Sequence, residues 1–555
     1  SQMQYTYTAA GKVGTISYRQ EDNTYRIYQY SYAKDGLPVK SVLPDGSVEA
    51  MSYDSLRRNK QIVYAPKSGA ADSKKLYTTY AYLPGKASSG AYTGTTELMS
   101  KYVNKFGSSG KAVSSFQYSY DTMGNVVSIT DAKKAVREYS YDSLGQVLTA
   151  KETYSNGATT QYAYVYDHGG NLLQEKVTDG QGQSITHTYE YDSVWKDKLI
   201  RYDGQEITYD PQLIGCPVTY RGMQFSWDAL QGKLTGVSLD GKDIAYRYNS
   251  SGQRYAKTVN GRDITYQYNN GLLLSQTSDT EKLNFYYDST GKLLELGYQA
   301  KKDNGWDTER RYFYARNGFG DIIAIYRNSD SKLIGTYEYD LWGRPVAVTE
   351  ATAGIDTDNI LELNPYRYRS YYYDGETGFY YVLNRYYDSG IGRWINADDQ
   401  ISDVGGDIRG YNQFSYCFNN PISLDDQSGC WPHKIKNVVK QVAKNIVRPA
   451  VKAVKKGLSK IDATYSIGVN ISATPSMWIL NGQIGISVDA RGNVALQASG
   501  GGGATTGTPS AAITFYRTIT NAPTIEKLEG SYGQVGGSIG IPIEGVPFYV
   551  GADIM

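Results

Sequence analysis

The residue types that most often carry catalysis are scarce in this chain of 555 residues. It has three histidines and three cysteines, all scattered along the sequence. This scatter argues against a zinc cluster, a disulfide framework and histidine-based catalysis, so we expect no metal and no cofactor. Among the carboxylates, Asp398 and Asp426 each lie beside a glycine-rich bend. Their spacing alone favours turn caps, but two carboxylates held close together can also act as acid and base on a water molecule.

The elements that position these acids are built from a chain of unusual composition. The chain has 55 tyrosines but only 11 phenylalanines, a net charge of +1, 40% apolar residues and a mean hydropathy of −0.50. No stretch approaches the roughly 20 apolar residues of a membrane-spanning helix, and the composition does not suit a disordered chain. The length indicates several domains or a repeat architecture. The opening residues lack a signal-peptide pattern, and we expect the sequence to be a piece of a longer protein.

A repeated unit accounts for the tyrosines. It reads Tyr-x-Tyr, followed by Asp or Asn, with Gly three residues later, and clear copies occupy residues 118–124, 139–145, 164–170, 246–252 and 337–343. Alternating tyrosines indicate a strand, the Asp or Asn can cap a turn, and the Gly can adopt a positive φ before the next strand. The unit therefore predicts a β-hairpin that must stack beside its neighbours in a continuous sheet. We expect its tyrosines to be structural.

These repeats resemble the Rhs/YD-repeat family, which includes bacterial polymorphic toxins, the C component of insecticidal toxin complexes and the animal teneurins. The resemblance covers residues 1 to about 430 and implies a mainly β fold, in which a hairpin strip spirals into a hollow shell. We call residues 1–365 the wall. Residues 366–430, called the closing segment, begin Tyr-Arg-Tyr-Arg-Ser-Tyr-Tyr-Tyr-Asp and continue to Gly-Arg-Trp-Ile-Asn-Ala-Asp. This pattern is similar to the Rhs-associated core.

The resemblance implies that the closing segment turns inward as a plug and carries an aspartyl autoprotease. The family's two aspartates correspond to Asp398 and Asp426, and cleavage would fall between Cys430 and Trp431. Arg393 is expected to orient or neutralise a carboxylate, or to form a structural ion pair. The sequence departs from the family pattern where Asp399 and Gln427 replace prolines and where a cysteine replaces a leucine or methionine. The two aspartates could instead cap turns.

The composition changes at residue 431, after which four of the 55 tyrosines occur. Residues 431–555, called the tail, carry 12 Lys or Arg against 6 Asp or Glu. Residues 431–462 predict a basic amphipathic helical linker that packs on a core, lies on an anionic membrane or, less favourably, binds nucleic acid. Residues 463–555 alternate small or polar with apolar residues, which predicts a separate, glycine-rich β domain and an α+β tail overall. This domain lacks His and Cys, so a conventional catalytic site is not expected there.

Taken together, the residues and the resemblance favour a secreted or cell-surface bacterial toxin. Its shell would enclose its own tail as cargo and release it by self-cleavage, with a delivery component and an immunity protein as possible partners. The tail would act on membranes. A different class of function also fits: a non-enzymatic adhesion or binding module with a YD shell, inert aspartates and a folded tail used for recognition.

Overall fold

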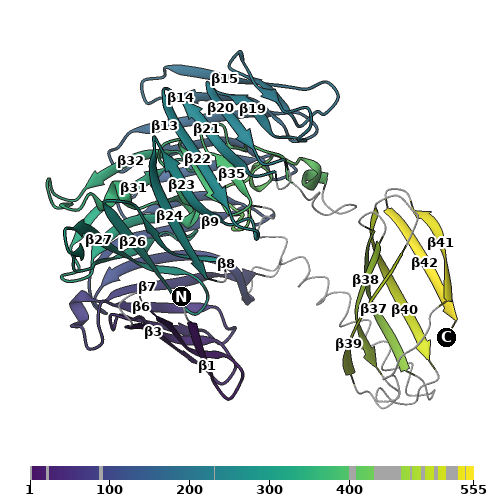
Figure 1. Cartoon of the computed structure of the whole chain (residues 1–555), viewed down its shortest axis with the longest axis horizontal. Helices are drawn as coiled ribbons and strands as arrows, with labels where there is room; N and C mark the ends of the chain where they lie inside the picture. Colours follow the sequence, from purple (N-terminus) through teal and green to yellow (C-terminus); the bar gives the residue numbers. More distant parts are fainter. Residues whose placement is uncertain are drawn as a thin grey trace. The chain divides into compact units, whose positions relative to one another are not determined.

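The computed structural model describes residues 3–19, 24–86, 92–229, 232–269, 271–398, 408–429, 464–474, 478–488, 494–504, 510–520, 535–543 and 546–554. The chain is divided into two compact units, residues 1–433 and residues 434–555. The division falls three residues after the change in composition at residue 431. Both units consist of antiparallel sheets, which confirms the mainly β fold (Figure 1). Among the described residues, no helix is long and apolar enough to cross a bilayer.

The wall forms two large sheets in which nearly every strand pairs with the next strand along the chain. The first sheet has 17 strands: β1 (Met3–Tyr7), β2 (Val13–Arg19), β3 (Tyr25–Tyr32), β4 (Pro38–Val42), β5 (Val48–Tyr53), β6 (Asn59–Ala65), β7 (Leu76–Lys86), β8 (Tyr92–Phe106), β9 (Ala112–Tyr120), β10 (Val126–Asp131), β11 (Val136–Tyr141), β12 (Val147–Thr153), β13 (Thr159–Tyr166), β14 (Leu172–Thr178), β15 (Ser184–Tyr191), β16 (Leu199–Tyr202) and β17 (Gln205–Glu206).

The second sheet has 15 strands: β18 (Thr208–Tyr209), β19 (Pro217–Tyr220), β20 (Met223–Trp227), β21 (Leu234–Leu239), β22 (Lys242–Tyr248), β23 (Arg254–Val259), β24 (Arg262–Asn269), β25 (Leu272–Thr277), β26 (Glu281–Tyr287), β27 (Leu293–Lys302), β28 (Gly305–Trp306), β29 (Arg310–Arg316), β30 (Ile322–Arg327), β31 (Leu333–Tyr339) and β32 (Pro345–Glu350). Strand β28 pairs only with β27, and β27 continues the sheet by pairing with β29.

The repeated unit forms the hairpin that its residues predict. In the turn between β9 and β10, Asp121 Oδ1 accepts hydrogen bonds from the backbone N–H groups of Met123 and Asn125, at 2.9 and 2.8 Å. Gly124 has a φ of 82°, a conformation that favours glycine. Another copy of the unit uses Asn249 for the same two bonds. The Asp or Asn therefore fixes the turn through its side-chain carbonyl oxygen, and its charge is not needed.

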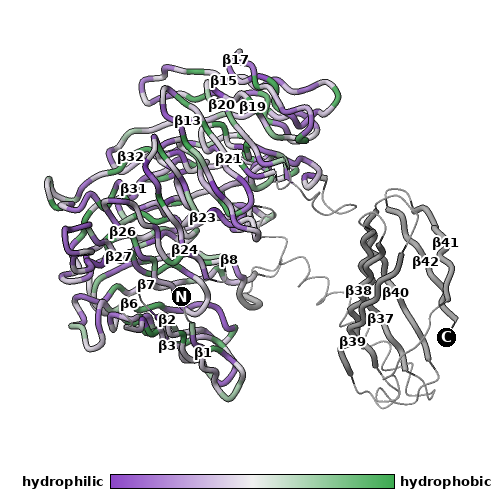
Figure 2. The backbone as a smooth tube through the Cα atoms, viewed as in Figure 1, coloured by the Kyte–Doolittle hydropathy of each residue, from purple (hydrophilic) through white to green (hydrophobic). Residues whose placement is uncertain are grey.

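The two tyrosines of each unit have different tasks. The first points into the protein and is buried in all five clear copies. The second often donates its hydroxyl to a backbone carbonyl of the preceding hairpin; for example, Tyr141 bonds the carbonyl of Val126 at 2.5 Å and Tyr166 that of Val147 at 2.9 Å. Each repeat is therefore tied to the one before it. Figure 2 shows hydrophilic and hydrophobic residues mixed along the strands of the wall, and in β13 buried and exposed residues alternate, as expected for a sheet with two different faces.

The second sheet packs on the first through aromatic side chains and buried ion pairs. The rings of Tyr64 in β6 and Phe313 in β29 lie 4.6 Å apart. The Tyr64 hydroxyl donates to Glu295 at 2.5 Å, and Arg311 contacts the same carboxylate at 2.9 Å. Because these groups are buried, their hydrogen bonds and opposite charges must compensate for lost hydration. The wall is therefore two layers thick here.

The closing segment and its approach contain short elements. These are α1 (Ile360–Leu363), the 3-10 turns Tyr368–Ser370, Ile408–Tyr411 and Cys417–Asn419, and the four strands β33 (Tyr372–Asp374), β34 (Phe379–Val382), β35 (Arg385–Asp388) and β36 (Arg393–Trp394) of one small sheet. This segment contacts both wall sheets. Asn420 donates to the carbonyl of Gly145 in the first sheet at 2.8 Å, and Arg254 of the second sheet contacts Asp374 at 2.5 Å.

The second unit contains the strands of the tail, in the region where the alternation of residues predicts a β domain. A four-stranded sheet has the order β39-β38-β37-β40, and β41 pairs with β42. The strands are β37 (Thr464–Thr474), β38 (Trp478–Val488), β39 (Val494–Ala504), β40 (Ser510–Thr520), β41 (Val535–Ile543) and β42 (Val546–Ile554). The predicted helical linker at residues 431–462 lies outside the described residues.

Candidate functional site

Two acids from distant parts of the closing segment meet at one arginine. Asp398 follows β36, and Asp426 lies in the loop after the turn at Cys417–Asn419. Arg385 Nη2, at the start of β35, lies 2.9 Å from Asp398 Oδ2 and 3.6 Å from Asp426 Oδ2. The two carboxylates are therefore neighbours across a shared guanidinium, and the structure brings together the pair that the sequence singled out.

All three side chains at this point are shielded from solvent. The exposed fractions are 8% for Asp398, 1% for Asp426 and 6% for Arg385. One guanidinium neutralises one carboxylate, so the second needs further hydrogen-bond donors. Asp426 Oδ1 lies 3.3 Å from the backbone N–H and 3.2 Å from the hydroxyl of Ser428. This is an environment in which an acid and a base can act side by side.

Arg385 also binds a backbone carbonyl in the segment expected to be cut. Its Nε donates to the carbonyl oxygen of Gly429, and its Nη1 donates to the carbonyl of Gln413 at 2.9 Å. The ring of Trp394 lies below the guanidinium, with 4.2 Å between the guanidinium carbon and the ring centroid. A guanidinium so fixed can polarise a carbonyl and stabilise negative charge that develops on its oxygen. The expected cleavage residues, Cys430 and Trp431, lie outside the described residues.

The loop that carries Asp426 is held by its backbone. The Tyr371 hydroxyl accepts a hydrogen bond from the Asp426 N–H at 2.9 Å and donates to the Asp426 carbonyl at 2.8 Å. Burial raises the pKa of Tyr371 well above its usual value of 10, so the hydroxyl keeps its proton. At the end of this loop, Gly429 has a φ of 72°, and a Cβ atom there would lie only 2.4 Å from the carbonyl oxygen of Val382. Only glycine fits this position without displacement.

The side chain of Arg393 contacts the wall. Its Nη1 donates to the Tyr191 hydroxyl and its Nη2 to the Asp197 carbonyl, each at 3.0 Å. These bonds attach the closing segment to the wall, and the shared arginine of the two acids is instead Arg385. Closeness in sequence pointed to Arg393, because it precedes Asp398 by only five residues. Position in the sheet decides otherwise, because Arg393 lies opposite Asp388 in the β35–β36 pair.

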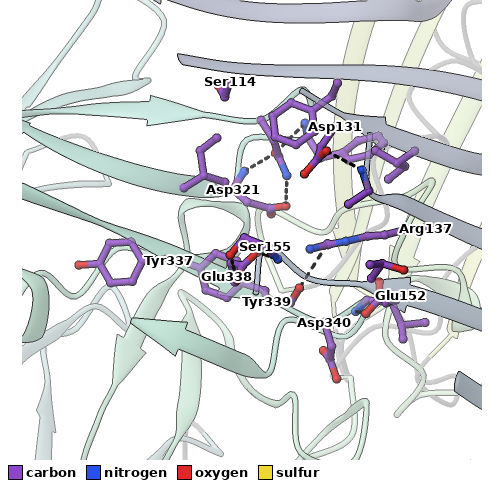
Figure 3. A pocket seen from close by; sticks show the side chains of 18 of the residues that line it. Ser114, Asp131, Arg137, Glu152, Ser155, Asp321, Tyr337, Glu338, Tyr339 and Asp340 are labelled. Carbon is purple, nitrogen blue, oxygen red and sulfur yellow. Dashed lines mark hydrogen bonds between the residues drawn. The ribbon is translucent and has the colours of Figure 1, made fainter. Parts of the chain in front are cut away.

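A separate cavity of about 290 Å³ lies between the two wall sheets and the closing segment (Figure 3). Arg137 reaches into it and lies 3.4 Å from the carbonyl oxygen of Tyr339. Glu338, one of the carboxylates that line the cavity, already has a partner. It accepts hydrogen bonds from the Ser155 N–H at 3.0 Å and from the Ser155 hydroxyl at 2.7 Å. These contacts join the sheets and leave no obvious nucleophile and base. Across the part of the chain that the structure describes, no group of three or more His, Cys, Asp or Glu could hold a metal ion.

Comparisons with known sequences agree with the repeat pattern. A family model described as the teneurin YD-shell matches residues 89–422. The chain is 32% identical over 250 residues to the tRNA nuclease WapA of Bacillus subtilis, a match that covers 43% of this chain and 10% of that protein. It is 26% identical over 234 residues to the toxin subunit YenC1 of Yersinia entomophaga, covering 38% of this chain and 22% of that protein. The chain therefore spans only a small part of these relatives.

Solved structures share the fold. A crystal structure of TcdB2-TccC3-Cdc42 superposes with a TM-score of 0.55 at 18% identity, covering 77% of this chain and 23% of that one. A crystal structure of TcdB2-TccC3 gives a TM-score of 0.51 at 17% identity, covering 76% of this chain and 24% of that one. At this level of identity, the likeness concerns the β-shell architecture alone.

Proposed function

Because the chain belongs to the teneurin YD-shell family, we propose that it is an Rhs-type toxin that frees its own tail by hydrolysis. The wall encloses the tail as cargo, and the closing segment cuts the chain between Cys430 and Trp431. The arrangement that carries this proposal is the pair of buried carboxylates on Arg385, which also binds the Gly429 carbonyl. A turn-capping role for these aspartates does not require a shared arginine.

The proposed reaction is one hydrolysis per chain. One carboxylate takes a proton from a water molecule, and the water oxygen attacks the carbon of the scissile carbonyl. The guanidinium of Arg385 stabilises the negative charge that forms on the carbonyl oxygen. When the C–N bond breaks, the other carboxyl group donates its proton to the leaving amine. The wall fragment then ends in a carboxylate, and the tail begins with a free amine.

Self-cleavage is tested by following newly made chain. Cell-free synthesis with a radiolabel, a chase and a denaturing gel should show fragments of about 430 and 125 residues. Asp398→Asn or Asp426→Asn should leave the chain whole, because each removes one of the two proton-transfer groups. Asp425→Asn is the matched control, since Asp425 adjoins the pair and bonds Gln427 at 2.8 Å. Wild-type chain that folds and stays whole would exclude the protease and favour an adhesion module with a YD shell.

The position of the cut needs its own measurement. Arg385 binds the carbonyl of Gly429, which belongs to the bond before Cys430, whereas the resemblance to the family places the cut after Cys430. Intact-mass spectrometry of the two fragments separates these bonds, because the products differ by one cysteine residue. A tail that begins with Trp431 supports the proposed bond, and one that begins with Cys430 moves the cut by one residue.

The tail is proposed to act on membranes after release. Its excess of basic over acidic residues is the supporting observation, since such a segment is attracted to anionic lipid. The relatives named as tRNA nucleases favour a second candidate, cleavage of tRNA. Full chain and its cleaved form are therefore tested for dye release from anionic vesicles and for cutting of purified tRNA. Leakage without tRNA cleavage supports the membrane proposal, and the reverse result replaces it.

The family match and the relatives also support coarser expectations about partners and location. A shell of this kind is proposed to act outside the producing cell, as a secreted or surface protein, with a separate delivery component. TcdB2 and TccC3 are named together in the solved structures that share this fold. An immunity protein would protect the producing cell from the tail. Co-purification of the chain with proteins encoded beside it tests both partners.

A further inference from the structure

One of the contacts between the wall and the closing segment is made by a buried arginine. Arg254, at the start of β23, is 1% exposed, and its guanidinium contacts both carboxylate oxygens of Asp374, at 2.5 and 3.2 Å. Asp374 ends β33 and is fully buried. Lys257, three residues further along β23, adds a contact of 3.0 Å to the same carboxylate and one of 2.9 Å to Glu376. Two wall cations therefore hold the first hairpin of the closing segment.

Four tyrosine rings surround the guanidinium of Arg254. Tyr246 and Tyr266 come from the wall, and Tyr372 and Tyr381 come from the closing segment, with ring centroids 4.3 to 5.1 Å from the guanidinium carbon. Aromatic faces attract cations, and this attraction is stronger where water is excluded. Because each part contributes two rings, the complete cage exists only when β23 and the closing segment are in contact.

The same guanidinium reaches the strand that carries the shared arginine of the candidate site. Arg254 Nη1 lies 3.2 Å from the Tyr386 hydroxyl, which also lies 2.8 Å from the Tyr248 hydroxyl. Tyr386 directly follows Arg385 in β35. Successive side chains of a strand point to opposite faces, so Tyr386 points to the wall while Arg385 points to Asp398 and Asp426. A shift of Tyr386 would therefore move Arg385 relative to the two acids.

We propose that Arg254 is a positioning residue for self-cleavage, and that it couples this reaction to closure of the wall. By holding Asp374 and Tyr386, it fixes β35 so that Arg385 meets both carboxylates. Chain whose wall has not closed on the closing segment lacks this support and stays whole. The cargo is thereby cut free only inside a formed container. This inference rests on the proposed function, because it concerns the same reaction.

A purely structural role accounts less well for these contacts. Replacing a buried ion pair with well-packed apolar groups often leaves a protein as stable or makes it more stable, so such a pair is a poor device for stability alone. It is a good device for fixing one arrangement, because charges and hydrogen bonds have strict geometry. A misplacement of about 1 Å at a reactive centre can lower a rate by about 100-fold, so removing the contacts that fix Arg385 should slow cleavage measurably.

Three variants test the coupling in the labelled-synthesis assay. Tyr386→Phe removes one hydroxyl, and the double variant Arg254→Met/Asp374→Asn removes the pair without leaving an unpaired charge. Both should cleave at least about 10-fold more slowly than wild type, because each lets Arg385 shift relative to the two acids. The control is Arg311→Met/Glu295→Gln, which removes a buried pair within the wall at 2.9 Å. Its cleavage rate should stay within about twofold of wild type, because among the described residues the side chains of this pair contact only other wall residues.

A second readout separates positioning from loss of stability. The Trp394 ring lies under Arg385, so its fluorine resonance in 5-fluorotryptophan protein, assigned with Trp394→Phe, reports where the guanidinium lies. In the uncleaved Asp398→Asn background, the Arg254 and Tyr386 variants should shift this resonance, and the Arg311 variant should not. Folded Arg254 and Tyr386 variants that cleave at the wild-type rate, or a control that slows equally, would overturn the coupling. Uncleaved wild type would instead reject the proposed function, while the resonance still tests positioning.

Discussion

Gly429 offers a test of how tightly the cleavage loop must fit. A Cβ atom at this position would lie 2.4 Å from the Val382 carbonyl oxygen and 3.3 Å from the Arg385 backbone nitrogen, whereas ordinary contacts begin at 3.4 Å. Gly429→Ala therefore has to move the loop by about 1 Å, away from the residue that binds its carbonyl. A misplacement of that size costs about 100-fold in rate, or about 2.7 kcal/mol of activation free energy.

The control for this substitution is Gly378→Ala in the turn between β33 and β34. Gly378 has a φ of 77°, close to the 72° of Gly429, so both variants pay a similar backbone cost of about 1 to 2 kcal/mol. Its Cβ would meet nothing closer than the Tyr373 hydroxyl at 3.8 Å. In labelled chain, Gly429→Ala should lose full-length protein about 100 times more slowly than Gly378→Ala. Equal rates would show that the carbonyl contact with Arg385 has no part in the reaction.

Three further outcomes follow from the contacts described. Arg385→Met should slow cleavage about 100-fold or more, whereas Arg393→Met should change it by less than about threefold; a reversed order in the labelled-chain assay would restore Arg393 to the site. Asp142→Ala should destabilise its hairpin by about 1 to 2 kcal/mol and speed hydrogen exchange at that turn, while Asp142→Asn should not, because another repeat uses asparagine for the same bonds. Burial raises the pKa of Glu295 and of Asp340 to about 7, so in the folded wall these groups keep protons that the unfolded chain has lost between about pH 4 and 7. Each group therefore lowers the stability of the folded wall as the pH rises across that window, so the unfolding temperature should be higher at pH 5.5 than at pH 7.5; Glu295→Gln should reduce this difference, and an unchanged difference would contradict the assignment.

The repeats were predictable from sequence because their information is local. In the hairpin at Asp121, the strand, the cap and the glycine all lie within seven residues, and each has its own physical signature. The alternation in the tail likewise predicted that this region forms strands. When one face of a strand is buried, apolar and polar residues alternate along its sequence. This alternation is the same however the sheets are arranged in space.

The candidate site was predictable only in part. Resemblance to a family selected Asp398 and Asp426, but no local pattern indicates that one arginine joins them. Arg385 lies in a strand rich in tyrosine and aspartate, and its role depends on a loop that begins after residue 420. The contact between Arg254 and Asp374 links residues 120 positions apart. Contacts between residues so far apart in the sequence depend on tertiary packing, and neither composition nor motif spacing predicts them.

The order of strands in the wall has a consequence for how the protein is made. Since nearly every strand pairs with its successor, each new hairpin can add to the sheet as it leaves the ribosome, without a search through distant partners. The face-to-face contacts, such as Tyr64 with Glu295, must wait for more than two hundred further residues. During synthesis the sheets can therefore grow first, their face-to-face contacts form later, and the closing segment becomes available only after all the wall strands have been made.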